Sequence, residues 1–552
     1  MVRSMRRGLA STISSVLINE ISANMKSVII IVCTLLLLLA CNQIDIKASK
    51  SKIDKQGKVE AGRYLDSAKL AQFINEHKMN DSAARLLRSF YKSRNYQFAW
   101  FTETGIAEST REFWTLHNNY IHNFGDTAFL FDALHQSIDQ LLTTDSTTKI
   151  LPQLRLQTEL QLTTHFFVYL NNAYAGKASP AVMQWHIPRK KLAEVALLNS
   201  FLARNGSDLQ DWEPVNMFYK RLKEELLHYN EIEKRGGWKI IALNKLKTYK
   251  LGDSSTLIAQ FKRRIHFTVM AREVDTNSYY SSELLPLVKS AQKSFGLKED
   301  GIITAALIKE LNVPVKERIR QILTNMERMR WLPYQPDSEF IGVNIPEFRL
   351  HLFEGEKKLF SIDIVVGKAA HNTVIFADKL QYVVFSPYWN VPPSIVRKEI
   401  LPAIKRNGSY LSKNNMERTG YADGLPVIRQ KPGGENALGR VKFIFPNSYN
   451  IYFHDTPAKS LFSEDSRAFS HGCMRLADPV KLVTHLLRQQ PEWITQKIAN
   501  AMDVSVEKWV TLKEEVPVYI TYFTAWVDSD GLLNFRKDIY NHDKKVARSL
   551  YE

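Results

Sequence analysis

Apolar residues recur every three or four positions through residues 65–265 of the chain. The runs 154–162 and 217–227 show this spacing most clearly. Such spacing is typical of amphipathic helices that bury one side. We therefore predict a helical scaffold domain over 65–265, with the aromatic residues of 91–101 packed in its core rather than forming a recognition surface.

A shorter helical pattern occupies residues 266–333. An apolar stripe over 284–295 ends at Gly296, a turn follows at Asp300-Gly301, and a second helix is predicted over 305–311. This pattern resembles the peptidoglycan-binding domain that is common in cell-wall enzymes. The resemblance implies a small wall-binding module, or a spacer built like one.

The periodicity changes to two after residue 338. Alternating runs on either side of Gly355 predict a β-hairpin, and two later β-type runs predict a mostly antiparallel sheet that ends about residue 456. Residues 392–440 interrupt this sheet and are rich in proline, glycine, asparagine and charge. Because a long insertion in a compact domain is more often functional than accidental, we predict a lid with a short helix near 395–401.

The N-terminus has the pattern of a secretory signal. A basic start at Met25-Lys26 precedes an apolar run over 28–39 and then Ala40-Cys41. The end of this run resembles the bacterial lipobox, which implies lipidation of Cys41 and translation from Met25. A plain signal-anchor helix is the alternative, although the run is short for a membrane span. The expected location is the periplasmic side of the cell envelope, anchored to a membrane as a lipoprotein.

These patterns predict a multidomain chain of the α plus β class. Its segments are a signal/lipoprotein segment (1–41), a tether (42–64), the helical scaffold domain (65–265), the peptidoglycan-binding-like domain (266–333), the catalytic β domain with its lid (338–525) and a C-terminal tail (526–552).

Composition narrows the choice of partners. The 552 residues carry a formal net charge of +17, which favours an anionic partner such as a wall polymer or phospholipid headgroups. No nucleic-acid-binding motif accompanies the charge, so we expect a solvated basic surface and no nucleic-acid partner.

The chain has three cysteines, and two of them fall in the signal segment. Cys473 is therefore left without an intrachain disulfide partner in an exported protein. Such a thiol is a candidate for a reactive group.

Cys473 lies in the stretch Ser470-His471-Gly472-Cys473-Met474-Arg475, which follows His454 after fifteen residues. A thiol attacks a carbonyl only as a thiolate, so it needs a base, and we expect His454 at a strand end to supply it. Gly472 allows backbone amides to form an oxyanion hole. Arg475 is placed to hold a substrate carboxylate or to brace the loop.

A zinc-binding site is the more specific alternative for these residues, because His454, His471 and Cys473 are all possible ligands. The chain has no C-x-x-C pair and no H-E-x-x-H string. We therefore expect neither a metal nor another cofactor.

The histidine, the spacer and Ser470-His471-Gly472-Cys473 together resemble the active-site signature of the L,D-transpeptidases with a YkuD-type catalytic domain. Residues 366–368 and 388–393, and the order of the segments, are similar to the large multidomain murein transpeptidases of the YcbB kind.

The resemblance implies an enzyme that takes a tetrapeptide stem of peptidoglycan, forms a thioester on Cys473, releases D-alanine and makes a 3-3 cross-link. It implies that His454 is the general base, that Ser470, His471 and Gly472 shape the loop, and that Arg475 supports the stem or the loop. Tyr452 and Trp389 are expected to line the cleft or to be packed beneath it. Acylation of Cys473 by carbapenems follows from the same thioester chemistry.

Two other functions remain open. Water in place of the acceptor amine gives an L,D-carboxypeptidase or peptidoglycan hydrolase. An inert Cys473 gives a non-catalytic wall-binding lipoprotein.

Overall fold

The computed structural model describes residues 64–103, 105–125, 132–143, 150–204, 212–242, 247–269, 275–333 and 338–551. The expected signal segment, Met25, the lipid site Cys41 and the tether up to residue 63 lie outside the described residues. Within the described residues, no helix has the length and apolar character needed to cross a membrane.

The N-terminal half is helical, as predicted. Its helices are α2 (Ser67–Glu76), α3 (Asp81–Ser93), α4 (Glu108–Phe124), α5 (Asp132–Thr143), α6 (Pro152–Leu170), α7 (Glu194–Arg204) and α9 (Met217–Lys234), and η2 (Asn171–Ala175), η3 (Pro180–Met183) and the two-residue strand β1 (Trp185–His186) lie between α6 and α7. The expected aromatic core is present: Trp100 is fully buried and packs on Phe113 and Phe166, with ring centroids 5.5 and 5.8 Å away.

Local sequence explains where several of these helices begin and end. The side chain of Asn80 accepts a hydrogen bond from the Ala83 amide and caps α3, and Pro152 occupies the first turn of α6, where a missing amide hydrogen costs nothing. Gly125 ends α4 in the left-handed conformation.

The small helical module contains α10 (Thr256–Val269), α11 (Leu284–Ser294) and α12 (Ala305–Leu311). The Gln292 side chain donates to Asp300 and accepts from the Gly301 amide, which fixes the turn between α11 and α12. The expected boundary at 265/266 runs through α10, whose buried residue Phe261 belongs to a helix that packs on α11 and α12. The module therefore begins before residue 266.

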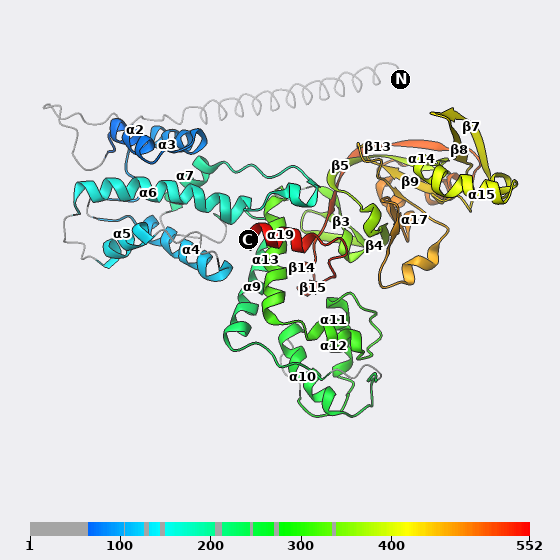
Figure 1. Ribbon diagram of the computed structural model, residues 1–552, viewed down its shortest axis with the longest axis horizontal. Helices are drawn as coiled ribbons and strands as arrows, with labels where there is room; N and C mark the ends of the chain where they lie inside the picture. The colour runs from blue at the N-terminus through cyan, green and yellow to red at the C-terminus, as the bar shows by residue number, and fades with distance from the viewer. Residues whose placement is uncertain are drawn as a thin grey trace, which may run out of the picture. The chain divides into compact units, whose positions relative to one another are not determined.

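Helix α13 (Val315–Trp331) joins this module to the β domain and packs on α9 and on the C-terminal helix α19 (His542–Tyr551) (Figure 1). Its buried face carries charge: Arg330 pairs with Glu327 at 2.8 Å, and Arg328 pairs with Asp543 at 2.7 Å. Buried cations are tolerated only with such partners. The Arg328 pair ties α13 to α19, and Arg330 also donates to the Ala173 carbonyl at 2.8 Å.

The β domain is built on one sheet with the strand order β1-β5-β13-β2-β3-β4-β12-β10-β9, and a further pairing of β5 with β9 closes it. The strands are β2 (Glu339–Asn344), β3 (Arg349–Glu354), β4 (Lys357–Gly367), β5 (Ile375–Phe385), β9 (Val441–Ile444), β10 (Phe453–His454), β11 (Ala468–Ser470), β12 (Met474–Leu476) and β13 (Lys508–Thr521).

Most neighbouring strands of this sheet are antiparallel, as expected, and β3 and β4 form the predicted hairpin around Gly355. Among the described strands, four pairs are parallel: β1 with β5, β13 with β2, β10 with β12 and β11 with β4. The expectation that the sheet ends about residue 456 is wrong, because β13 lies between β5 and β2 in its middle.

The insertion folds as a unit of its own. It contains β6 (Trp389–Asn390), α14 (Pro393–Ile395), η6 (Val396–Ile400), α15 (Leu401–Arg406), α16 (Tyr410–Lys413), β7 (Met416–Ala422) and β8 (Leu425–Gln430). These elements lie together (Figure 1, yellow) around a small apolar core of Val391, Val396, Ile400 and Ile428.

The C-terminal residues are packed rather than tail-like, which differs from the tail expected at 526–552. After α17 (Pro479–Leu486) and α18 (Thr495–Ala501), the chain forms β13, a hairpin of β14 (Ala525–Val527) with β15 (Leu533–Phe535), and α19. Val546 of α19 is fully buried. Charged residues separate many of the apolar residues in this stretch, so its packing against α13 was not predicted from the sequence.

Candidate active site

The site is organised by the parallel pairing of β10 with β12, in which Phe453 lies opposite Met474 and His454 lies opposite Arg475. Successive residues of a strand point to opposite faces of the sheet. Phe453 and Met474 are both fully buried on one face. His454 and Arg475 therefore share the other face. Tyr452 and Cys473, which precede the buried pair, lie on this same face.

Several contacts agree with this alternation. The Met474 amide donates to the Tyr452 carbonyl at 3.2 Å, so Cys473 lies beside Tyr452. The Tyr452 and His454 rings are 5.7 Å apart between centroids. The hydroxyl and the backbone amide of Tyr452 both reach the sulfur of Cys473. The structure thus brings together Tyr452, His454, Cys473 and Arg475, four residues that the sequence singled out.

The Cys473 thiol is a free cysteine side chain with an intermediate exposure, and its Sγ donates to the Asn450 carbonyl at 3.6 Å. Burial raises the pKa of this thiol, while the Tyr452 hydrogen bonds and the Arg475 cation oppose the rise. At neutral pH the resting sulfur is therefore protonated, and it needs a base to become a nucleophile.

Asn450 was not identified from the sequence. It adopts the left-handed backbone conformation, with φ of 57°, in a turn that the Asn447 side chain organises by accepting from the Tyr449 amide and donating to the Ile451 carbonyl. Asparagine is a general turn residue, because its side chain can bond to the backbone two residues further on. It does not reveal which carbonyl the turn aims at the sulfur.

His454 is held as a neutral base. Its Nδ1 lies 2.5 Å from the Asp455 carbonyl oxygen, which can only accept, so Nδ1 carries the ring hydrogen and Nε2 keeps its lone pair. Burial, and then the nearby Arg475 cation, lower the pKa of His454 to about 4. Within the described residues, no hydrogen bond joins the His454 ring to Cys473 in this arrangement, since the thiol donates to Asn450 instead.

The loop before Cys473 is tied down by hydrogen bonds from Ser470. The Ser470 hydroxyl donates to the Cys473 carbonyl at 2.6 Å and accepts from the Gly472 amide at 3.1 Å. Gly472 has φ of 123°, a conformation that side-chain-bearing residues rarely adopt. Because the Gly472 amide is already bonded to Ser470, the Cys473 amide is the better candidate for an oxyanion donor: in the part of the chain that the structure describes, it has no acceptor.

A second group of residues, which the sequence did not reveal, also holds this loop. Thr373 is buried, and its hydroxyl donates to the Gly472 carbonyl at 2.9 Å and accepts from the Gly367 amide at 2.9 Å. The Tyr540 hydroxyl donates to the Gly367 carbonyl and accepts from the Thr373 amide. A Cβ on Gly367 would lie 2.1 Å from the His371 carbonyl oxygen, so this approach requires glycine.

Arg475 is a half-buried cation whose guanidinium makes no hydrogen bond or ion pair within the described residues, and its Nε is fully buried. The pKa of Arg475 is lowered by burial and raised by Cys473.

His471 and Trp389 both contact residues of the lid. His471 is exposed, and its Nε2 lies 3.5 Å from a carboxylate oxygen of Glu399 in the lid, so the lid and the motif loop are in contact. Trp389 packs against the apolar core of the lid, which was the alternative to a cleft position. Among the described residues, no three histidine, cysteine or acidic side chains are arranged to hold a metal ion.

Residues 338–511 match a family described as the L,D-transpeptidase catalytic domain, YkuD, and residues 85–226 match one described as a scaffold domain. A protein of Haemophilus influenzae that is named as an L,D-transpeptidase is 27% identical over 253 residues, or 43% of this chain. The match spans 50% of that relative, so the chain corresponds to about half of its length.

Two solved structures are also similar. An L,D-transpeptidase of Xylanimonas cellulosilytica is 10% identical, with 51% of this chain and 100% of that chain covered and a TM-score of 0.18. L,D-transpeptidase 3 of Mycobacterium tuberculosis is 12% identical, with 34% and 63% covered and a TM-score of 0.18. These identities and TM-scores are too low to assign a role to this chain.

We expect Arg475→Gln to raise the pKa of both Cys473 and His454, because the guanidinium lowers both. The pH profile of Cys473 alkylation by iodoacetamide should move upward by about one unit, the size expected for losing a nearby opposite charge. Arg488→Gln, at an exposed pair with Glu339, is the matched control. Equal profiles for the two variants would show that Arg475 does not act on the sulfur.

We expect Thr373→Val to lower the free energy of unfolding by about 1–3 kcal/mol, because it leaves the Gly472 carbonyl and the Gly367 amide buried without their partner. It should also change the alkylation rate of Cys473 and shift the backbone amide resonances of Gly472 and Cys473. Thr373→Ser keeps the hydroxyl and is the control. Identical resonances in the two variants would contradict a role in holding the loop.

Proposed function

We propose that the chain makes 3-3 cross-links in peptidoglycan through a thioester on Cys473, because residues 338–511 match the YkuD L,D-transpeptidase catalytic domain. The observation that carries the proposal is the shared face of β10 and β12, where a neutral imidazole and a lone thiol lie on adjacent strands. Peptidoglycan stem peptides are the proposed partners.

In the first half-reaction, Cys473 Sγ attacks the carbonyl carbon of the third residue of a tetrapeptide stem, and the thiol proton passes to Nε2 of His454. The carbonyl oxygen becomes an oxyanion, and the Cys473 amide is the nearest unengaged donor for it. One such donor typically contributes about 3 kcal/mol to the transition state. The amide bond to the terminal D-alanine breaks, its nitrogen takes the proton from His454, and a thioester remains on Cys473.

In the second half-reaction, the side-chain amine of a second stem attacks the thioester carbonyl, and His454 removes its proton. The carbon–sulfur bond breaks, and the sulfur takes the proton back from His454. The product is a new amide between the third residues of two stems, and the enzyme returns to its starting state.

The resting charges suit this sequence of steps. A thiol with a raised pKa and an imidazole with a pKa of about 4 do not form an ion pair at rest, so the proton moves only as the sulfur attacks. The Tyr452 hydroxyl, which reaches the sulfur, stabilises the thiolate as it forms.

Arg475 is proposed to bind a carboxylate of the donor stem. It is a half-buried cation on the same face as the sulfur, and the described residues give it no anionic partner. A charge-assisted, two-point contact with a carboxylate fits a guanidinium well. This role places the stem so that its third residue, rather than its fourth, lies over Cys473.

The lid is proposed to favour the amine over water as the acceptor. Glu399 of the lid faces His471 of the motif loop, so the lid lies close to the reacting centre. Restricting water protects a thioester from hydrolysis. This distinguishes the transpeptidase from the carboxypeptidase that the same catalytic groups would otherwise support.

We expect the purified full chain to convert disaccharide-tetrapeptides into 3-3-linked dimers with release of D-alanine, as followed by chromatography and mass spectrometry. Cys473→Ala should abolish the product, and His454→Gln should lower the rate at least about a hundredfold, the usual contribution of a positioned base. Monomeric tripeptide without dimer would indicate a carboxypeptidase, and sacculus binding without any product would indicate a wall-binding protein.

A carbapenem gives an independent readout of the same nucleophile, because its strained carbonyl acylates the sulfur and stays attached. Intact-protein mass spectrometry should show one adduct on the unsubstituted chain and none on Cys473→Ala. An adduct that survives the substitution contradicts the assignment.

We also propose that Cys41 is lipidated and holds the chain on the periplasmic side of a membrane. The support is the signal pattern that ends at Ala40-Cys41. Mass spectrometry of the mature N-terminus from membrane-extracted protein should find a lipid-modified Cys41. An unmodified Cys41, or a mature chain that starts at Met1, would exclude the anchor.

A further inference from the structure

A second cavity, of about 450 Å³, lies away from Cys473. Its volume is within the range of small-molecule sites. It is lined by the start of α9, the turn after α11, strands β2 to β4, the end of β13 and the β14–β15 hairpin. Cys473, His454, Tyr452 and Arg475 do not line it, so the catalytic steps above leave it unused.

The floor of the cavity is aromatic. The Trp526 indole is nine-tenths buried there, and the Arg536 guanidinium lies 4.9 Å from its ring. Phe353 contributes a second ring, stacked on that of Phe340 with the centroids 5.0 Å apart. Broad aromatic surfaces of this kind bind the apolar faces of a ligand and leave its polar groups for the rim.

Positive charge predominates among the half-buried residues of the lining. Five cations stand against two carboxylates, namely Arg221, Lys293, Lys358, Arg467 and Arg536 against Glu347 and Asp528. The exposed rim has the opposite balance, with Glu299, Glu356, Glu464 and Asp465 against Lys298 and Arg349. Exposed charges are screened by salt, so the interior decides which ligand is attracted.

Both interior carboxylates are already engaged. Glu347 accepts from His351 Nε2 at 2.9 Å, and the positive charge around it lowers its pKa to about 2. Asp528 pairs with Lys293 at 3.3 Å and accepts from the amides of Asp530 and Leu532. Their charges also act on Arg536, but within the described residues neither carboxylate forms an ion pair with Lys358.

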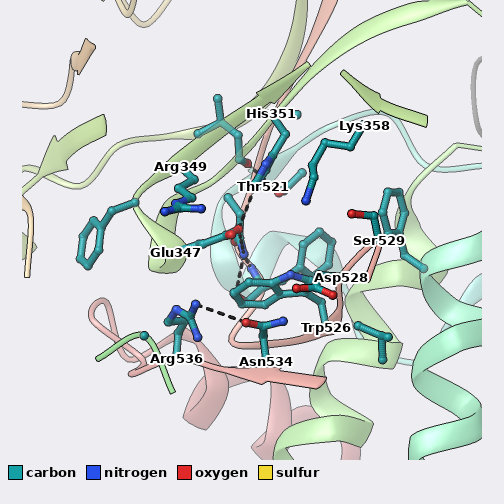
Figure 2. Close-up of a pocket in the computed structure, with 18 of the residues that line it drawn as sticks. Glu347, Arg349, His351, Lys358, Thr521, Trp526, Asp528, Ser529, Asn534 and Arg536 are labelled. Atoms are coloured by element: carbon teal, nitrogen blue, oxygen red, sulfur yellow. Dashed lines mark hydrogen bonds and ion pairs between the residues drawn. The ribbon is translucent and has the colours of Figure 1, made fainter. Parts of the chain in front are cut away.

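Lys358 is the cation left over. Within the described residues its ammonium makes no hydrogen bond or ion pair, and Asp530 acts on it only from beyond pairing distance. Figure 2 shows Lys358 among the residues that line the same pocket as Trp526, whereas the Ser529 hydroxyl is engaged, because it donates to Asp530 Oδ1 at 3.5 Å. Among the described lining residues, the Lys358 ammonium is therefore a cation without an ion-pair partner beside an aromatic floor, and such a cation favours a ligand that carries a carboxylate.

Two sides of the cavity are formed by segments that belong to other parts of the molecule. One is the turn of the small helical module, Gly296 to Glu299. The other is the spacer between His454 and Ser470, which contributes Phe462 to Asp465 and Arg467. The Arg467 carbonyl accepts from the Val366 amide at 2.9 Å, three residues before Ser470.

We propose that this cavity is a second, non-catalytic binding site for a carboxylate-bearing peptidoglycan fragment, the disaccharide-peptide unit of the wall. This inference rests on the proposed function for the choice of ligand. Lys358 binds a stem carboxylate, and the rings of Trp526 and Phe353 contact the apolar faces of the fragment. The site holds one peptidoglycan fragment next to the small helical module while the stem of another fragment reacts at Cys473.

The test uses the full chain with Cys473→Ala, which prevents turnover, and calorimetry with purified, uncross-linked disaccharide-tetrapeptide. Two binding events per chain are expected. Lys358→Met should weaken one of them about tenfold, the usual effect of losing a charged hydrogen bond, and Lys358→Arg should largely restore it. Lys357→Met, at the exposed neighbour on β4, is the matched control and should change neither event.

Equal isotherms for Lys358→Met and Lys357→Met, or a single binding event that Lys358→Met leaves unchanged, overturn the proposal. Dimer formation from soluble fragments by the Cys473-intact chain separates this result from the function itself. If dimers form and Lys358→Met binds normally, the second site is wrong and the transpeptidase stands. If Lys358-dependent binding occurs but no dimers form, the site stands and the catalytic proposal fails.

Discussion

The chemistry of this chain depends on one backbone feature, the parallel pairing of two very short strands, β10 and β12. The pairing puts a histidine and a cysteine on the same face of adjacent strands, and the two-residue period buries Phe453 and Met474 underneath them. Full burial of these two side chains fixes the register, because a shift by one residue would exchange the buried and reacting faces. The apolar core thus positions the reacting groups.

The charges of the site follow from the same arrangement. Burial alone disfavours both the thiolate and the imidazolium, and it is the first cause of the pKa shift at Cys473 and at His454. Arg475, opposite His454, then acts in opposite ways on the two groups, since it stabilises the anionic sulfur and destabilises the cationic ring. The result is a protonated, weakly reactive thiol beside a base that is ready to accept its proton.

The sequence predicted the parts of the fold and site that are encoded locally. Helical periodicity predicted the scaffold, and the turn at Gly355 predicted the hairpin. The motif that contains Cys473, together with the preceding histidine, pointed to four residues of the candidate site. It missed contacts between distant segments. Tyr540 bonds to Gly367, 173 residues earlier in the chain, and β13 lies in the sheet between β5 and β2, which precede it by more than a hundred residues. A lone threonine such as Thr373 carries no local signal of its two buried hydrogen bonds.

The spacer of fifteen residues between His454 and Ser470 now has a physical reason. Antiparallel neighbours can be joined by a tight turn, but parallel neighbours need a connection of about a dozen residues or more to return the chain to its starting end. Residues 455–473 make this return through η7 (Lys459–Ser463) and β11, which pairs in parallel with β4. A much shorter spacer would force β10 and β12 to be antiparallel, which would change the register that sets His454 against Arg475. The spacing is therefore a requirement of the strand geometry, and the residues that satisfy it are free to form the wall of a second cavity.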